Sequence, residues 1–175
     1  MDINYRDLDL KANPGAFSEF DAEVLVPDVM NLKAGDVYLE VGVDRGKSLS
    51  IARMVNPKQR VIGVDIQEDP RVPNTEFYQG DSVDVANSLE NLEIDVLFID
   101  GDHTYAGCKR DIDAWYPHMK KDGVMLFHDC DETSPGVVQA VAEFVHTHKV
   151  EKWDICKRTD KNTSMSRVKL YGGLS

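Results

Sequence analysis

The sequence is short of cysteine, of positive charge and of long apolar runs. It has 3 cysteines among 175 residues, and Cys108, Cys130 and Cys156 form no CxxC pair. Scattered cysteines in odd number argue against a disulfide framework or a zinc cluster, and they favour a reducing compartment. No stretch is long and apolar enough to cross a bilayer, and the first residues do not read as a signal peptide. These absences predict a cytoplasmic protein.

Basic residues are outnumbered, with 20 Lys and Arg against 31 Asp and Glu and a formal net charge of -11. Such a chain repels phosphates, so we expect neither nucleic acid nor a membrane as its partner. The small basic groups near Arg45 and Lys109 are interpreted as solvated helix faces. A hydrophobic content of 42% is ordinary for a globular protein. This length can bury a core without disulfides, so we predict one domain spanning residues 1–175.

Short apolar runs alternate along the chain with segments of helical periodicity. The strand candidates are mostly apolar, as buried parallel strands are; they are Val37–Val41, Val61–Ile66, Glu76–Gln79, Asp95–Ile99 and Val124–His128. The helices predicted after these strands are Ser48–Val55, Ser82–Leu89, Thr104–Lys120 and Pro135–His148. Two last strand candidates, Trp153–Lys157 and Ser166–Tyr171, flank the short polar loop Arg158–Thr163, which is typical of an antiparallel hairpin.

This alternation predicts an α/β fold with a Rossmann-like, doubly wound sheet built from βαβ units. We expect a mostly parallel, seven-stranded sheet that ends in a C-terminal antiparallel hairpin. A helical segment within residues 1–33, at Phe17–Leu32, precedes a Rossmann-like core of residues 34–175. In such sheets, ligands bind beyond the carboxyl ends of the strands, at the topological switch point. The polar residues at those ends are therefore the candidates for function.

The first strand leads into the segment EVGVDRGKS, from Glu40 to Ser48. Gly42 and Gly46 allow the backbone to turn tightly and to approach a ligand closely. The helix that follows offers unpaired N–H groups in its first turn. The carboxylate of Glu40 would repel a pyrophosphate and suit a ligand that carries an ammonium or sulfonium charge. On its own, the motif also fits a simple strand-to-helix turn.

Aspartates follow the next two strands. Asp65, with Ile66 after it, lies about 20 residues beyond the glycine loop, where nucleotide-binding folds place an acidic group on the ribose hydroxyls. The alternative is an aspartate in a solvent-facing turn. Asp81 after the third strand is suited to accept from an adenine amino group. Asp81 and Ser82 are equally suited to capping the helix that follows, and both roles can hold together.

Carboxylates and imidazoles gather after the fourth and fifth strands. Asp100, Asp102 and His103 follow the fourth strand, and His128 and Asp129 end the fifth. Because these strands are neighbours in the predicted sheet, the two groups should face one crevice. Two such groups arise less easily by chance than one.

Together these residues resemble the class I S-adenosylmethionine-dependent methyltransferases. The resemblance is strongest to a small group with the segment FIDGDHTYAGCKRDIDAWYPHMKKDGVMLFHDC, here Phe98 to Cys130, and weaker to the catechol- and caffeoyl-type O-methyltransferases. It extends from about Val37 to Asp129. It implies transfer of a methyl group from S-adenosylmethionine to a hydroxyl of a small molecule or a sugar. The sulfonium is an activated donor, so the protein would mainly hold donor and acceptor in line.

The resemblance also implies roles for single residues, from the methionine end of the cofactor through the ribose to the adenine. The residues implied to bind the cofactor are Glu40, Gly42, Gly46, Ser48, Asp65, Ile66, Asp81, Ser82 and Asp100. Asp100 would lie beneath both the methionine moiety and the acceptor, and it is also implied in catalysis. The general-base lysine of the related enzymes falls at His103, and a histidine can do the same work. Asp102 is placed to orient that imidazole.

Metal-dependent relatives bind a divalent cation through an aspartate and an Asp-Asn pair, which match Asp100, His128 and Asp129 here. The histidine is a departure from that pattern, since imidazole suits magnesium poorly and suits manganese, iron or zinc better. A divalent metal is therefore an open question at this stage.

Three other interpretations are weaker. A phosphate loop needs four residues between its glycine and GK[ST], and Gly42 to Ser48 has three. A nicotinamide enzyme needs GxGxxG, which is absent. A protein that binds S-adenosylmethionine without catalysis would have the same fold, but nothing in the sequence indicates a broken site. The chain has little length for covering an acceptor, which leaves open a homodimer whose second subunit completes the site.

Overall fold

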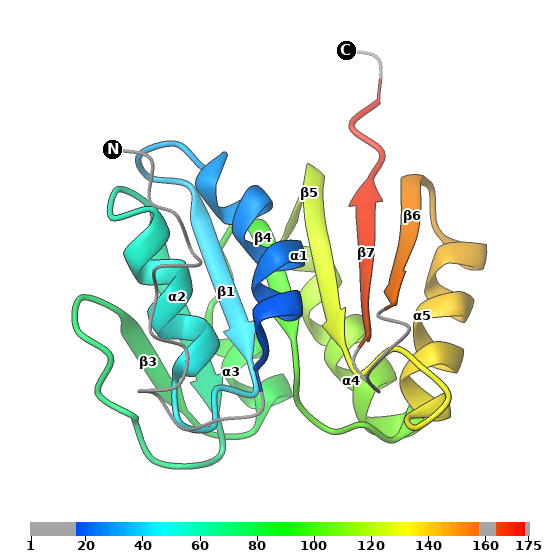
Figure 1. Ribbon diagram of the computed structural model, residues 1–175, viewed down its shortest axis with the longest axis horizontal. Coiled ribbons are helices and arrows are strands. Elements are labelled where there is room, and N and C mark those ends of the chain that lie inside the picture. The colour runs from blue at the N-terminus through cyan, green and yellow to red at the C-terminus, as the bar shows by residue number, and fades with distance from the viewer. Residues whose placement is uncertain (1–16, 158–163, 174–175) are drawn as a thin grey trace.

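The computed structural model describes residues 17–157 and 164–173 (Figure 1). These residues form one seven-stranded sheet of order β3-β2-β1-β4-β5-β7-β6. The strands are β1 (Val37–Val41), β2 (Arg60–Asp65), β3 (Glu76–Gln79), β4 (Ile94–Ile99), β5 (Met119–His128), β6 (Val150–Lys157) and β7 (Ser164–Leu170). β1 to β5 pair in parallel, and β7 is antiparallel to both β5 and β6. The predicted fold class is confirmed, while the loop at residues 158–163 lies outside the described residues.

Helices cover both faces of the sheet. They are α1 (Glu19–Met30), α2 (Lys47–Val55), α3 (Ser82–Ser88), α4 (Tyr105–Trp115), the 3-10 turn η2 (Tyr116–His118) and α5 (Pro135–Thr147). Side chains alternate along β1 as in any strand. Leu39 packs in the core that α3, α4 and α5 cover, and Tyr38 packs in the core that α1 and α2 cover. The buried strands thus read as continuous apolar runs because both of their faces are covered.

The helix predicted as Thr104–Lys120 is shorter in the structure. It ends at Trp115, because Pro117 has no backbone N–H to continue the helical hydrogen bonds, and the chain continues as the 3-10 turn η2. Met119 then starts β5, so Asp122-Gly123 lies within a strand and is not the predicted turn. A register shift against β4 accommodates the additional residues as a bulge.

Helix α1 is attached to strand β7 by a pair of hydrogen bonds between charged side chains. The Arg167 guanidinium on β7 donates from Nε and Nη2 to the two carboxylate oxygens of Asp28, both at 2.7 Å. Such a two-point contact fixes direction as well as position. At its other end, α1 begins beside the carboxyl ends of β4 and β5. The longest helix of the described residues has 13 residues. No helix in the described part of the chain is long and apolar enough to span a membrane.

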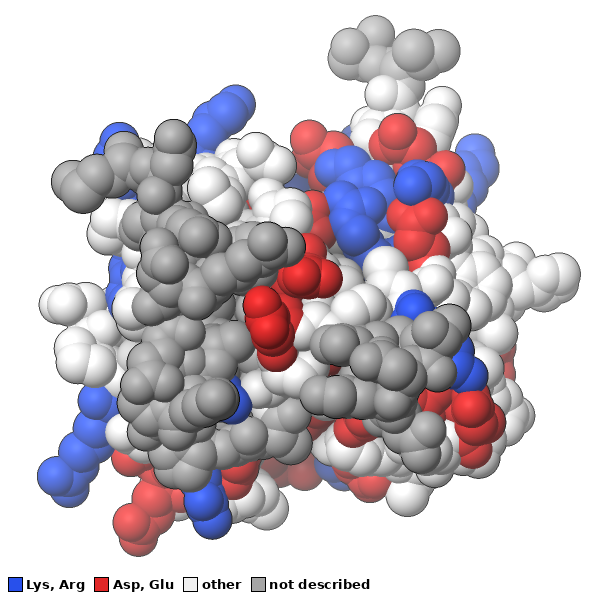
Figure 2. Space-filling model, viewed as in Figure 1, with Lys and Arg blue, Asp and Glu red and all other residues white. Residues whose placement is uncertain are grey.

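The carboxyl ends of β1 to β5 lie along one edge of the sheet, the lower edge in Figure 1. Figure 2 shows acidic side chains gathered along the lower margin of the same view. This is the edge at which the sequence places its polar residues.

Candidate active site

Two hollows share the edge at which the parallel strands end. The first, about 320 Å³, is lined mainly by residues that follow β1, β2 and β3, and we call it the Asp65 hollow. The second, about 230 Å³, is lined by residues that follow β1, β4 and β5 and by Phe17, and we call it the His103 hollow. Both hollows include Gly42, Asp44 and Asp100 in their walls, so they meet at the end of β4.

The loop after β1 needs its two glycines. Gly42 has φ +85°, and a Cβ there would lie 2.2 Å from the carbonyl oxygen of Asp100. Gly46 has φ +76°, and a Cβ there would lie 2.7 Å from the side chain of Val72. A side chain at either position would combine left-handed strain with a collision. The loop therefore passes directly over the end of β4, and its backbone forms part of both hollows.

Asp65 holds this loop in place. Its Oδ2 accepts hydrogen bonds from the backbone N–H groups of Val43 at 2.7 Å and Asp44 at 2.8 Å, and its Oδ1 accepts from Gln67 N at 2.8 Å. The carboxylate also lines the Asp65 hollow. It is thus not a free aspartate in a solvent-facing turn. Beside it, Ile66 lines the same hollow with 74% of its surface exposed, which is unusual for an aliphatic side chain of this size.

Glu40 lies beneath the loop and not in a hollow. Its side chain is fully buried, and its two oxygens accept hydrogen bonds from Ser48 Oγ at 2.5 Å and Tyr38 Oη at 2.7 Å. Burial raises the pKa of Glu40 to about 8, although both hydroxyls oppose that shift. The carboxyl is thus largely neutral at pH 7, which differs from the free charge that the sequence suggests. Ser48 lines the His103 hollow and connects Glu40 to it.

Asp81 and Ser82 lie at the other end of the Asp65 hollow. Asp81 is the N-cap of α3, where one oxygen accepts from Val83 N at 3.0 Å and the other lies 3.1 Å from Arg110 Nη2. Ser82 is the first helical residue and not the cap, and its hydroxyl accepts from the indole N–H of Trp115 at 2.8 Å. The capping interpretation thus holds for Asp81, and both residues remain in the wall of the hollow.

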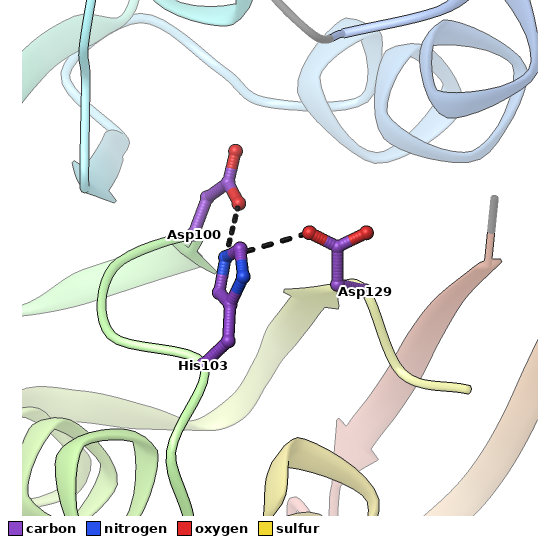
Figure 3. A group of neighbouring side chains, drawn as sticks. All are labelled: Asp100, His103 and Asp129. Carbon is purple, nitrogen blue, oxygen red and sulfur yellow. Dashed lines mark ion pairs between the residues drawn. The ribbon is translucent and has the colours of Figure 1, made fainter. Parts of the chain in front are cut away.

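His103 stands between two carboxylates in the second hollow (Figure 3). Its Nε2 lies 3.5 Å from Asp100 Oδ1 and 3.4 Å from Asp129 Oδ2. The hydrogen bond with Asp100 raises the pKa of His103, the charge of Asp129 adds to this effect, and partial burial opposes it. Asp102, predicted to orient the ring, instead accepts a hydrogen bond from Thr104 N at 2.8 Å. Asp100 and Asp129 therefore do the orienting.

His128 lies below this group and is 5% exposed. Its Nδ1 is 3.2 Å from Asp100 Oδ1 and 3.1 Å from Asp129 Oδ2, while its Nε2 is 3.4 Å from Asp21 Oδ2. Burial disfavours the charged ring, but the carboxylates outweigh it and hold the pKa of His128 well above its ordinary value. With carboxylates at both nitrogens, His128 is an imidazolium at neutral pH.

The start of α1 contributes two residues that the sequence analysis does not single out: Asp21 in its first turn and Phe17 just before its N-cap. Asp21 is fully buried against His128 and also completes a capping box with Ser18. Phe17 lines the His103 hollow, and its ring stacks over His128 with centroids 6.3 Å apart. The spacing of Ser18 and Asp21 is a readable helix-start signal. The pairing with His128 has no signal in the sequence, because 107 positions in the chain separate the two residues (128 − 21).

A divalent cation fits part of the predicted ligand set. Ligand atoms of Asp100, His103 and Asp129 lie within 4.8 Å of one another. Two carboxylates and an imidazole suit manganese, iron or zinc better than magnesium. The predicted ligand His128 is oriented for ion pairs, since both of its nitrogens face carboxylates. The structure thus places His103 where the sequence analysis expects His128.

The sequence of this chain matches a family model and a viral relative. The family model described as "Methyltransferase domain" matches residues 39–130, which is more than half of the chain. A relative, uncharacterized protein R132 of Acanthamoeba polyphaga mimivirus, is 31% identical over 130 residues. That alignment covers 62% of this chain and 58% of the viral protein, so the chain spans little more than half the length of this relative.

Solved structures share the fold at low identity. Cofactor-bound Rv0187 from MTB has a TM-score of 0.75 at 16% identity, covering 94% of this chain and 87% of that one. An O-methyltransferase from Bacillus cereus in complex with SAH has a TM-score of 0.70 at 17% identity, covering 91% and 86%. MycE, a methyltransferase of the mycinamycin biosynthetic pathway crystallised with Mg, SAH and mycinamycin VI, has a TM-score of 0.68 at 16% identity, covering 94% and 54%.

Neighbours at this level of identity establish the fold alone, and the family match rests on the sequence from β1 to the end of β5. That region contains both glycines of the loop, Asp65, Asp81 and the Asp100–His103 group. Taken with the sheet order and the hollows at its carboxyl edge, the match shows that this chain belongs to the methyltransferase domain family, with a Rossmann-like class I fold.

Proposed function

We propose that the protein is an S-adenosylmethionine-dependent methyltransferase that methylates a hydroxyl oxygen of a small molecule or sugar. The observation that supports this most directly is the meeting of the two hollows at Asp100. One hollow has the glycine loop and the aspartate that suit a nucleoside, and the other has an imidazole between two carboxylates. A donor in the first and an acceptor in the second would face each other across the end of β4.

The cofactor would lie with its ribose at Asp65 and its base toward Gly80, Asp81 and Ser82. The oxygens of Asp65 already accept from backbone amides, and each carboxylate oxygen can accept more than one hydrogen bond. The exposed side chain of Ile66 would cover one face of the base, which removes apolar surface from water. The SAH bound in the Bacillus cereus enzyme and in MycE supports this choice of cofactor.

Catalysis needs little covalent chemistry from the protein, because the sulfonium carries its methyl group in activated form. The loop and Asp100 would hold the donor in line with the acceptor oxygen. As the methyl group passes from sulfur to the acceptor oxygen, its bond to sulfur breaks and S-adenosylhomocysteine is the leaving group. The imidazole of His103, in its neutral form, would take the proton that the acceptor hydroxyl loses. His128 and Asp21 would support this arrangement from below by fixing the positions of Asp100 and Asp129.

We further propose that a divalent cation, where one is bound, is held by Asp100, Asp129 and His103. When bound it would act as a Lewis acid that lowers the cost of ionising the acceptor hydroxyl. An imidazole that ligates a cation cannot accept the proton as well, so the two roles of His103 exclude each other. Methyl transfer in the presence of EDTA assigns His103 to the role of base, and transfer that needs added Mn²⁺ assigns it to the role of ligand.

The rival readings have lost support. The phosphate-loop interpretation conflicts with the family match and with the aspartates that line the Asp65 hollow, which would repel a triphosphate. A binding protein without catalysis is not favoured by any residue of the His103 group. A single domain over residues 1–175, a cytoplasmic location and a homodimer remain proposals, to be tested by limited proteolysis, fractionation and light scattering.

The test of the proposed function is calorimetric titration of the protein with S-adenosylhomocysteine. We expect a dissociation constant in the micromolar range, which corresponds to a binding free energy of about −8 kcal/mol. Gly42→Arg should show no measurable binding, because a side chain there collides with the backbone of Asp100 and displaces the loop. Asp65→Ala should also lose binding, because it frees the loop. ATP is the matched control ligand and should not bind. Binding of ATP without S-adenosylhomocysteine would overturn the proposal.

A further inference from the structure

Asp111 on α4 is a buried carboxyl group in the wall of the Asp65 hollow. The residue is only 3% exposed, and its Oδ1 has no hydrogen-bond partner among the described residues. Leaving a buried carboxyl oxygen without a donor is costly, because water has been removed and nothing replaces it. In a wall that faces a ligand space, such an oxygen is suited to accept a hydrogen bond from the ligand.

The surroundings of Asp111 place it between the loops that follow β3 and β4. A Cβ at Gly101 would lie 3.0 Å from Asp111 Oδ2, so the carboxyl packs against the loop after β4. On its other side, Ser82 and Arg110 are the neighbours that favour its ionised form. Burial outweighs them and raises the pKa of Asp111, although the Ser82 hydroxyl is a hydrogen-bond partner of the carboxyl group.

Asp81, which the motif implies as the contact of the adenine, is occupied by comparison. One of its oxygens caps α3 through Val83 N, and the other faces Arg110. Asp81 is the half-buried N-cap of α3, where water can replace a lost hydrogen bond at smaller cost than at a fully buried carboxyl group. Of the two carboxyl groups at this end of the hollow, Asp111 is the one with a buried oxygen that lacks a hydrogen-bond donor.

The donor follows from the proposed function, on which this inference rests. With the ribose at Asp65, the base of the cofactor extends toward the end of β3, where Asp111 lies. The exocyclic amino group is the hydrogen-bond donor of the adenine ring. We infer that Asp111 accepts a hydrogen bond from this amino group and is a specificity-determining residue that selects adenine over hypoxanthine.

The experiment compares two ligands by calorimetry: S-adenosylhomocysteine and S-inosylhomocysteine, in which a carbonyl oxygen replaces the amino group. The wild-type protein should prefer the adenine ligand by at least about tenfold. Asp111→Asn should reduce that preference to about threefold or less, because its amide can donate to the carbonyl oxygen. Asp81→Asn tests the other carboxyl group at this end of the hollow. Asp113→Asn, on the exposed face of α4, is the matched control and should retain the wild-type preference.

The outcomes separate this inference from the proposed function. Failure of the wild-type protein to bind either ligand would reject both. A wild-type protein that binds both equally, or a preference lost in Asp81→Asn and kept in Asp111→Asn, would reject only the role of Asp111. If Asp111→Asn does not fold, Asp111→Ser takes its place.

A measurement on the wild-type protein alone adds a second test. The ligand is the analogue of S-adenosylhomocysteine that carries unsubstituted purine in place of adenine. It has hydrogen in place of the amino group, so it removes the donor without adding bulk. It should bind at least about tenfold more weakly than S-adenosylhomocysteine. Equal affinity for the two would contradict the inference without any variant.

Discussion

The two hollows are built from similar residues and are held in different ways. In the Asp65 hollow, Asp65 and Asp81 are held by hydrogen bonds from backbone amides. In the His103 hollow, each imidazole faces carboxylates from the ends of both β4 and β5. Backbone amides therefore fix carboxylates of the first hollow, whereas the second is a charge network whose behaviour depends on protonation. Under the proposed function, recognition of the cofactor uses the fixed carboxylates of the first hollow, and proton transfer uses the titratable groups of the second.

The largest effect is expected from a variant that removes an imidazole of the His103 hollow and leaves the Asp65 hollow intact. His103→Ala should lower the turnover number by about 10²- to 10⁴-fold, because the general base is removed. The dissociation constant of S-adenosylhomocysteine should stay within about threefold of the wild-type value, since the Asp65 hollow is untouched. Steady-state turnover and calorimetry on the same preparation check both. Full activity in the variant would exclude His103 as base and as metal ligand.

The buried pair beneath the His103 hollow sharpens the comparison through stability. Asp21→Asn leaves His128 without the buried partner of its Nε2 and keeps the shape of the side chain. Removing one partner of a buried ion pair costs about 3 kcal/mol in the free energy of unfolding. Urea denaturation at pH 7 measures the change. Asp113→Asn, on the exposed face of α4, is the control and should change the free energy of unfolding by less than about 0.5 kcal/mol.

The pH dependence of turnover tests the charge network of the His103 hollow. The pKa of His103 is raised, so its imidazole is protonated, and inactive as a base, up to a pH above the ordinary value of about 6.5. Below that pKa the turnover number should fall about tenfold per pH unit, and above it the value should level off. Asp129→Asn removes one of the charges that raise the pKa and should move the midpoint to lower pH. Measurement in EDTA keeps metal binding out of the profile, and a midpoint that stays in place would contradict the assignment.

The smallest effect concerns the apolar part of the first hollow. Ile66→Ala removes an exposed aliphatic side chain that would cover one face of the base. About 1 kcal/mol of apolar contact should be lost, which weakens binding of S-adenosylhomocysteine about fivefold. The turnover number at saturating cofactor should not change. Calorimetry measures the first quantity and an assay at high cofactor concentration the second, and unaltered affinity would remove Ile66 from the site.

Much of the fold was predictable, because its signals are local. β1 and β3 have the predicted bounds, since turn residues flank each strand. The end of α4 was mispredicted because Met119 continues the helical spacing although Pro117 has already ended the helix. Within the site, the loop glycines and the aspartates at the strand ends could be located, because parallel strands bring their carboxyl ends to one edge.

The sequence by itself determined which residue types stand at the carboxyl edge of the sheet, and therefore the family and the class of cofactor. Only the tertiary structure decided which of these groups are free to act. Glu40 is buried and largely neutral, Asp81 is engaged in a cap, and His128 is enclosed by carboxylates. Asp21 and Asp111 come to the site on helices distant in the chain. The physical reason is that burial and partners set the charge and hydrogen-bonding capacity of a side chain, and both depend on contacts that no local pattern records.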